Sequence, residues 1–174
     1  MRASPFAAAP HDLGACRLEP MTPPDAATVA ARLPEMDPWR RLGYHAAALA
    51  PYLTQEDPSL TRWALYDGDA LAGGVAVRFP WLRGPYLELL AVFPEAQGRG
   101  VGAAVLGALQ RAAAHEGNLW AMVSAFNENA RRFYRRHGFA EICRVPALVR
   151  PGHDELLLRW VPGPAGRMAD RRPP

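Results

Sequence analysis

The stretch of sequence that decides the fold spans residues 97–103 and reads Gln97-Gly98-Arg99-Gly100-Val101-Gly102-Ala103. An apolar, strand-like run over residues 85–93 precedes it, and apolar residues at helical spacing follow over residues 100–115. In the first turn of a helix, the backbone N–H groups have no partner within the helix, and the helix dipole adds about half a positive charge. Glycine lets an anion approach this backbone closely because it has no Cβ. The stretch therefore predicts a loop that binds phosphate groups.

Three other kinds of structure contain similar glycine clusters. A tight turn without a ligand is the simplest, and the glycines alone do not exclude it. A Walker-type nucleotide loop needs Gly-Lys-Ser or Gly-Lys-Thr, which this stretch lacks. A Rossmann loop is compatible with Gly98-x-Gly100-x-x-Ala103, but it needs an acidic residue about 20 positions further on, and residues 122–126 contain none. The stretch also follows a predicted hairpin, whereas a Rossmann domain needs repeated strand–helix–strand units.

The segment before residue 60 carries signals for one strand and two helices. Residues 15–19 predict a short first strand. Thr22 followed by two prolines predicts a helix that begins there and ends near Leu33, since threonine caps helices and proline suits their first turn. Leucines and alanines at helical spacing predict a second helix from near Trp39, which Pro51 kinks or ends.

The rest of the chain predicts mainly strands. Asp67-Gly68-Asp69 is a strong hairpin signal, and Gly138 is expected to stop a helix at its C′ position. The predicted elements are, in order, strands over 60–66, 71–79 and 85–93, a helix over 100–115, a strand over 119–125, a helix over 127–137, and strands over 139–145 and 155–161. The last two strands would form an antiparallel pair joined by a proline-containing loop. We therefore expect an α/β fold whose sheet is mostly antiparallel, with one parallel, right-handed crossover in the middle.

Length and composition indicate one globular domain. The 174 residues suit a single core, with 49% hydrophobic and 21% charged residues. We expect flexible tails over residues 1–13 and 162–174 around a domain over 14–161. All 20 basic residues are arginine and the net charge is +3, which is compatible with a polyanionic ligand but does not predict nucleic-acid binding. Cys16 and Cys143 lack metal-ligand spacing and predict two reduced thiols. Without a signal-peptide pattern or a membrane-spanning run, the expected location is cytoplasmic.

Two motifs in order resemble a known family. Gln97-x-x-Gly100-x-Gly102 is similar to the pyrophosphate-binding motif of the GNAT superfamily of acetyl-CoA-dependent N-acetyltransferases. Asn127-x-x-Ala130-x-x-Phe133-Tyr134-x-x-x-Gly138-Phe139 resembles the family's second cofactor helix and the turn after it, and the likeness spans about residues 15–161. The resemblance implies a mixed sheet of about 6–7 strands with helices on both faces, splayed between the fourth and fifth strands.

The resemblance also implies where acetyl-CoA binds. The backbone of Leu90–Val92 would pair with the pantetheine arm like an added strand, and the glycine loop would hold the pyrophosphate. Arg99 would either reach a phosphate or remain solvated. No metal is expected. The residues expected to contact the cofactor are Leu90, Ala91, Val92, Gln97, Gly98, Arg99, Gly100, Val101, Gly102, Ala103 and Asn127.

Two residues are expected to move protons. By resemblance, Tyr134 is the general acid that protonates the leaving thiolate; the alternative is that it only packs. Glu88 is the candidate base, because even-numbered residues of a strand over 86–92 share one face and Glu88 would then lie beside Tyr86 near the cofactor arm. Partial burial would raise the pKa of Glu88 to a useful range. The alternative is an ion pair with Arg78 or Arg83.

The expected acceptor is the primary amine of a small molecule. Bacterial enzymes that acetylate ribosomal-protein N-termini are the nearest alternative, and Pro38-Trp39 is similar to their early Pro-Trp pair. Those relatives carry Glu and Arg where this chain has Met122 and Ser124, and a tyrosine pair in the last hairpin loop, which residues 146–153 lack. Trp39, Tyr44 and Tyr86 would either wall an acceptor pocket or pack the core. A non-catalytic acyl-CoA-binding module and a homodimer through an edge strand near the C-terminus remain open.

Overall fold

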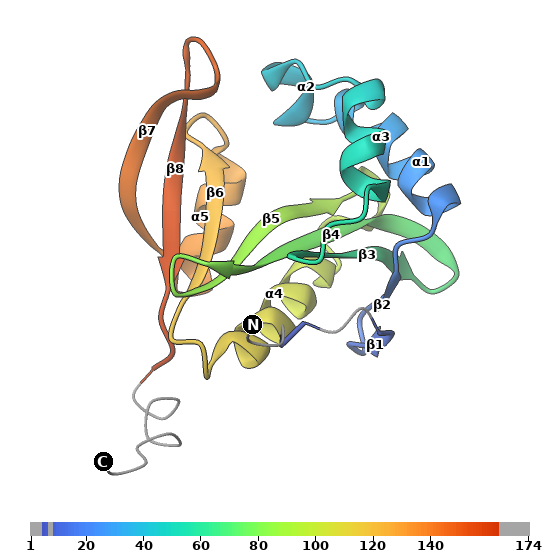
Figure 1. The fold of residues 1–174 in the computed structure, drawn as a ribbon, viewed down its shortest axis with the longest axis horizontal. Coiled ribbons are helices and arrows are strands. Elements are labelled where there is room, and N and C mark those ends of the chain that lie inside the picture. The colour runs from blue at the N-terminus through green and yellow to red at the C-terminus, as the bar shows by residue number, and fades with distance from the viewer. Residues whose placement is uncertain (1–4, 7–8, 164–174) are drawn as a thin grey trace.

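One eight-stranded sheet forms the centre of residues 5–6 and 9–163, the part of the chain that this computed structural model describes (Figure 1). The strands lie in the order β1-β2-β3-β4-β5-β6-β8-β7. Each neighbouring pair is antiparallel except β5 and β6, which are parallel and joined by a helix. The strands are β1 His11–Asp12, β2 Arg17–Pro20, β3 Leu60–Asp67, β4 Ala70–Trp81, β5 Gly84–Val92, β6 Leu119–Ser124, β7 Ala140–Arg150 and β8 His153–Trp160.

Helices cover both faces of the sheet (Figure 1). One hydrophobic core lies between the sheet and α1 and α3, and a second lies between the sheet and α4 and α5. Both the α/β class and the helices on two faces were predicted from the sequence. The helices are α1 Pro23–Arg32, α2 Trp39–Leu42, α3 Ala46–Thr54, α4 Val101–Ala113 and α5 Glu128–Arg136, with short 3-10 helices η1 Leu33–Glu35 and η2 Pro94–Ala96.

Local sequence signals explain several element boundaries. The Thr22 side chain accepts a hydrogen bond from the Asp25 N–H while the Asp25 carboxylate accepts one from the Thr22 N–H, a capping box that fixes the start of α1. Gly68 adopts a φ of 59° in the turn between β3 and β4, a conformation that glycine tolerates best. These two predictions, the capped helix and the hairpin, are confirmed.

The pairing of β4 with β5 shifts by one residue at Glu88. Val77 pairs with Leu87, and its neighbour Ala76 pairs with Leu89. Glu88 is therefore an extra residue on β5, which forms a β-bulge.

This bulge changes which face of the sheet the following side chains point to. Leu87 belongs to the core under α4 and α5, whereas Leu89 and Ala91 belong to the core under α1 and α3. Leu90 and Val92 pack against the α4 side. The prediction that even-numbered residues over 86–92 share one face is therefore wrong, because an extra residue reverses the alternation of a strand.

The two halves of the sheet separate between β5 and β6. These strands pair only at Tyr86 with Trp120 and at Leu87 with Ala121. Beyond these pairs the strands diverge toward the end of the sheet where α2 and the tip of the β7–β8 hairpin lie (Figure 1). They correspond to the fourth and fifth predicted strands, so the predicted splay is confirmed.

Three other boundaries differ from the prediction. The second helix is broken at Gly43, which adopts a φ of 78° after α2, whereas Pro51 lies inside α3 without ending it. Strand β7 continues through Pro146 to Arg150, where a loop was expected. Between the pairs Val145–Glu155 and Arg150–His153, residues 146–149 face only one residue of β8, so the strand is irregular there.

The predicted N-terminal tail over residues 1–13 belongs in part to the fold. Phe6 is buried, the Trp63 indole donates a hydrogen bond to the Ala9 carbonyl, and β1 adds a strand at the edge of the sheet. Of the predicted C-terminal tail, residues 164–174 lie outside the described part of the chain. None of the described helices is both long and apolar enough to span a membrane.

Candidate active site

The glycine loop leads directly into α4, as the sequence predicts. Gly98 and Gly100 adopt φ values of 75° and 81°, and Gly100 is the N-cap of α4 without any side-chain cap. A Cβ placed on either glycine would meet nothing within 4 Å. The space beside these two glycines is therefore open, and the first-turn N–H groups of α4, from Val101 to Ala103, lack helical partners. This end of α4 is a site of positive potential with room for an anion.

Two side chains fix the shape of this loop. The Gln97 amide donates a hydrogen bond of 2.8 Å to the Val92 carbonyl at the end of β5. The Arg99 guanidinium lies 2.5 Å from the carboxylate of Asp67, the last residue of β3. Arg99 is still 62% exposed. Gln97 therefore ties the loop to the end of β5. Arg99 forms an ion pair, which was neither of the two roles expected for it.

The backbone of β5 beside the loop is open on one side. From Leu89 to Val92 the strand pairs with β4, whereas its pairing with β6 ends at Leu87. An exposed strand edge of this kind can pair with an extended ligand. Leu90, Ala91 and Val92, the residues expected to contact the pantetheine arm, all lie on this open edge.

Asn127 is the N-cap of α5. Its side-chain Oδ1 accepts a hydrogen bond of 3.1 Å from the Ala130 N–H, which stabilises the start of that helix. The Asn127 Nδ2 is not needed for the cap. The structure therefore gives Asn127 a structural role and leaves its amide donor for another partner.

Tyr134 contacts its neighbour Phe133 edge to face, at 5.4 Å between ring centroids, but the two rings also have separate partners. Phe133 lies against the start of α4, where a Cβ on Gly102 would be 3.6 Å from its ring. The Tyr134 ring is buried and contacts Phe139 edge to face at 5.2 Å between centroids. Burial, and to a lesser extent the nearby Tyr86, raise the pKa of Tyr134 well above its ordinary value. Its hydroxyl therefore stays protonated at neutral pH, as a proton donor must.

Glu88 is held by a bidentate ion pair. The Arg78 Nε lies 2.6 Å from one carboxylate oxygen of Glu88, and Nη2 lies 3.1 Å from the other. Arg78 also donates to Asp57 at 2.8 Å and to the Ser59 hydroxyl at 2.7 Å. Of the two alternatives for Glu88, the structure shows the ion pair, and its partner is Arg78 rather than Arg83.

The three aromatic residues expected to wall the acceptor pocket come from two parts of the chain: the Tyr44 N–H donates a hydrogen bond of 3.0 Å to the Trp39 carbonyl, and Tyr86 lies on β5. Tyr86 stacks on Trp81 at 4.7 Å between ring centroids. Burial is the largest cause that raises the pKa of both Tyr44 and Tyr86, and the carboxylates of Glu88 and Glu155 raise it further. Tyr44 and Tyr86 therefore share one electrostatic environment. Trp39 packs against the core under α1 and α3.

The sequence-based prediction missed Glu155, the first residue of the predicted last strand. It lies on β8 opposite Ser124 and is 4% exposed. Burial raises the pKa of Glu155, and a hydrogen bond with the Ser124 side chain opposes part of that shift. The only sequence signal for a buried carboxylate here was that Glu155 directly precedes the apolar run Leu156-Leu157-Leu158.

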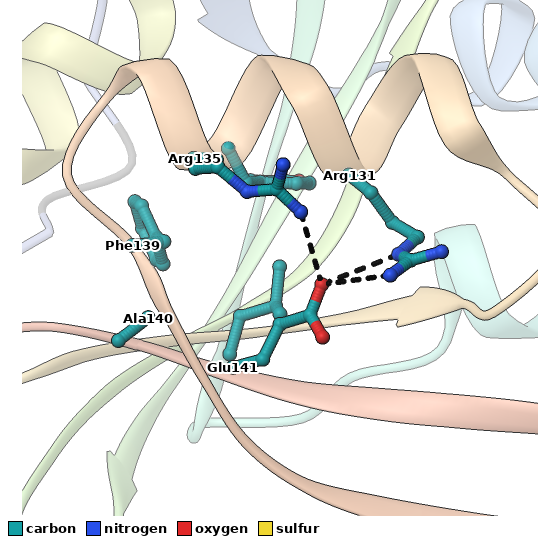
Figure 2. A pocket seen from close by; sticks show the side chains of 7 residues that line it. Arg131, Arg135, Phe139, Ala140 and Glu141 are labelled. Atoms are coloured by element: carbon teal, nitrogen blue, oxygen red, sulfur yellow. Dashed lines mark hydrogen bonds and ion pairs between the residues drawn. The ribbon is translucent and has the colours of Figure 1, made fainter.

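A cavity of about 250 Å³ lies between α5 and β7 (Figure 2). Figure 2 shows Glu141 reaching toward two arginines of α5, at 3.2 Å from Arg131 and 3.7 Å from Arg135. Tyr134 also lines this cavity, but the glycine loop does not. Because the glycine loop does not border this cavity, we do not assign the pyrophosphate of the cofactor to it.

Comparison with known proteins is consistent with this geometry. Residues 26–139 match the model of the acetyltransferase (GNAT) family. Among solved structures, the chain is similar to a nourseothricin acetyltransferase at 31% identity, with a TM-score of 0.55 over 64% of this chain and 70% of that chain. No match is found among curated proteins.

Two further solved structures share the fold at lower identity. One is the ribosomal-protein-S18-alanine N-acetyltransferase from Escherichia coli, at 19% identity and a TM-score of 0.68 over 91% of this chain and 99% of that chain. The other is Ard1 from Thermoplasma volcanium, at 20% identity and a TM-score of 0.68 over 86% and 99% of the two chains.

Proposed function

This chain belongs to the GNAT acetyltransferase family, and we propose that it transfers the acetyl group of acetyl-CoA to a primary amine of a small molecule within a ternary complex. The observation that carries the proposal is the uncapped N-terminus of α4. Two glycines with positive φ, Gly98 and Gly100, precede this end of the helix. The strand before them, β5, is unpaired on its β6 side beyond Leu87.

The residues present fit acetyl-CoA. The N–H groups of Val101, Gly102 and Ala103 would hold the pyrophosphate, since no side chain caps them and no Cβ occupies the space before them. The open edge of β5 over residues 89–92 would pair with the amide groups of the pantetheine arm. The Asn127 Nδ2 remains as a further donor, because its Oδ1 caps α5. Together these groups offer an anion site beside an unpaired strand edge.

The chain also offers a proton donor for the chemistry. Acetyl-CoA supplies the carbonyl carbon that the amine attacks and the thiolate that leaves, so the products are an N-acetyl amine and free CoA. Tyr134 supports the role of general acid, since its buried hydroxyl stays protonated at neutral pH. The family match favours an enzyme over a non-catalytic acyl-CoA-binding module.

The small-molecule acceptor rests on two observations. The nourseothricin acetyltransferase is 31% identical to this chain, whereas the enzyme for ribosomal protein S18 is 19% identical. Residues 146–149 form the irregular part of β7 and contain no tyrosine that could close over a peptide. The fold is shared with the S18 enzyme over nearly the full length of both chains, so a protein N-terminus is the second candidate. A cytoplasmic location and a homodimer stay predictions.

The test combines binding and turnover. Calorimetric titration with acetyl-CoA measures binding, and the release of free CoA measures transfer to a panel of small amines and N-terminal peptides. We expect acetyl-CoA to bind and small amines to be acetylated with the higher kcat/KM. Peptides preferred by about a hundredfold, or roughly 2.7 kcal/mol of transition-state stabilisation, would replace the small-molecule assignment with the second candidate.

A further inference from the structure

Glu155 differs from every other strongly buried carboxylate in the described part of the chain. It is 4% exposed, and its Oε1 is inaccessible and has no hydrogen-bond partner. The other buried carboxylate, Asp25, receives hydrogen bonds from the Thr22 N–H, the Thr22 hydroxyl and the Tyr66 hydroxyl. Buried carboxylates are costly unless they are paired, so an unpaired oxygen on Glu155 calls for a functional explanation.

Neighbouring acidic residues have cationic partners that Glu155 lacks. Arg78 binds Glu88 through two nitrogens, and Arg144 lies 3.0 Å from Asp154, the residue before Glu155. The ion pairs found over residues 9–163 do not include Glu155. A positive charge supplied from outside the chain would complete this site.

The position of Glu155 suits the reacting amine. Its pairing with Ser124 is at the far end of β6, where that strand has diverged from β5. Tyr44 and Tyr86 both interact electrostatically with its carboxylate, and Tyr86 also interacts with Tyr134, the proposed acid. Tyr86, which pairs with Trp120 where β5 and β6 are still joined, is therefore close to both Glu155 and Tyr134. Tyrosine rings beside a carboxylate suit an organic cation.

We propose that Glu155 is a catalytic residue that binds the acceptor as an alkylammonium ion and removes its proton. This inference rests on the proposed acetyl transfer. One N–H bond of R–NH₃⁺ breaks and the proton passes to the Glu155 carboxylate, directly or across one water molecule. Glu155 becomes a neutral carboxylic acid, and the nitrogen keeps the electron pair with which it attacks. The acceptor class is a primary alkylamine, which carries a positive charge at neutral pH.

Other groups near Glu155 do not take over this role. Ser124 on β6 is its hydrogen-bond partner, and Tyr44 and Tyr86 have raised pKa values that keep them neutral. Glu88 on β5 is held by Arg78, and Asp154 on β8 is held by Arg144. His153 contacts Phe126 edge to face at 5.3 Å.

The test compares Glu155→Gln with Glu141→Gln, a matched change at a carboxylate outside the proposed site. Acceptors are alkylamines such as 2-phenylethylamine and spermidine, which are cations at neutral pH, and arylamines such as aniline, which are neutral. We expect Glu155→Gln to lower kcat/KM for alkylamines by roughly 10²–10⁴ and for arylamines by less than about tenfold. Glu141→Gln should change neither.

A second readout does not depend on turnover. Because burial raises the folded-state pKa of Glu155, the folded protein binds more protons than the unfolded chain between the two pKa values, so this residue lowers stability as pH rises. Glu155→Gln should therefore raise Tm near pH 8 by more than it does near pH 5. Equal losses on alkylamines and arylamines, or a Tm that falls at both pH values, would show a structural role and overturn the proposal.

These measurements distinguish a failure of the role of Glu155 from a failure of acetyl transfer. If the wild-type protein binds acetyl-CoA and acetylates alkylamines while Glu155→Gln keeps full kcat/KM, the role of Glu155 is wrong and the acetyl transfer stands. If the wild-type protein acetylates none of the amines, the proposed function itself is wrong, whatever the variant does.

Discussion

Replacing Gly100 by alanine isolates the backbone contact on which cofactor binding depends. At a φ of 81° an L-residue is strained, which costs about 1–2 kcal/mol of stability. The added Cβ meets no protein atom within 4 Å, so it projects into the space before the first turn of α4. If it displaces two charge-assisted hydrogen bonds of about 1.5 kcal/mol each, the loss is about 3 kcal/mol and Kd for acetyl-CoA rises roughly 150-fold.

Gly117→Ala is the matched control for the strain in this experiment. Gly117 adopts a φ of 82°, with nothing within 4 Å of its added Cβ, and it lies at the other end of α4, before β6. Both variants should lose similar stability in denaturant unfolding, and only Gly100→Ala should lose affinity in calorimetric titration with acetyl-CoA. Two folded variants with equal, near wild-type Kd values would refute the assignment of the pyrophosphate to this loop.

Three further substitutions separate structural from chemical roles. Tyr134→Phe should lower kcat by roughly 10²–10⁴ with little change in Kd for acetyl-CoA, because it removes only the proton donor; unchanged turnover would leave Tyr134 as a packing residue. Glu88→Gln should lower the free energy of unfolding by about 1–2 kcal/mol, because it breaks the bidentate pair with Arg78, and loss of the acidic limb of kcat/KM would instead make Glu88 the base. Asn127→Asp should keep Tm, because a carboxylate still caps α5, but weaken acetyl-CoA binding by removing the amide donor; an equal Kd would argue against that contact.

Much of the fold could be predicted because its signals are local. The hairpin at Asp67-Gly68-Asp69, the cap at Thr22 and the glycine loop each depend on a few adjacent residues whose conformational preferences are strong. The order of these elements then predicted one parallel crossover. The splay between β5 and β6 was predicted from the family resemblance.

The site was less predictable because it depends on contacts between distant segments. The sequence around Glu88 carries no signal for a β-bulge, because the bulge arises from the register of β5 against β4. The unpaired carboxylate oxygen of Glu155 can be recognised only once β8 is paired with β6, which places Glu155 opposite Ser124. Gly43, rather than Pro51, breaks the second helix, because Gly43 adopts the positive φ that ends α2, whereas Pro51 lies inside α3, which continues to Thr54.

The most direct test of acetyl transfer follows the acetyl group itself. The protein is incubated with acetyl-CoA labelled with ¹³C in the acetyl group and with the panel of alkylamines, arylamines and N-terminal peptides, and the products are identified by mass spectrometry. We expect labelled N-acetyl alkylamine and one free CoA for each acetyl group transferred. Binding of acetyl-CoA without label on any amine above the uncatalysed rate would contradict it.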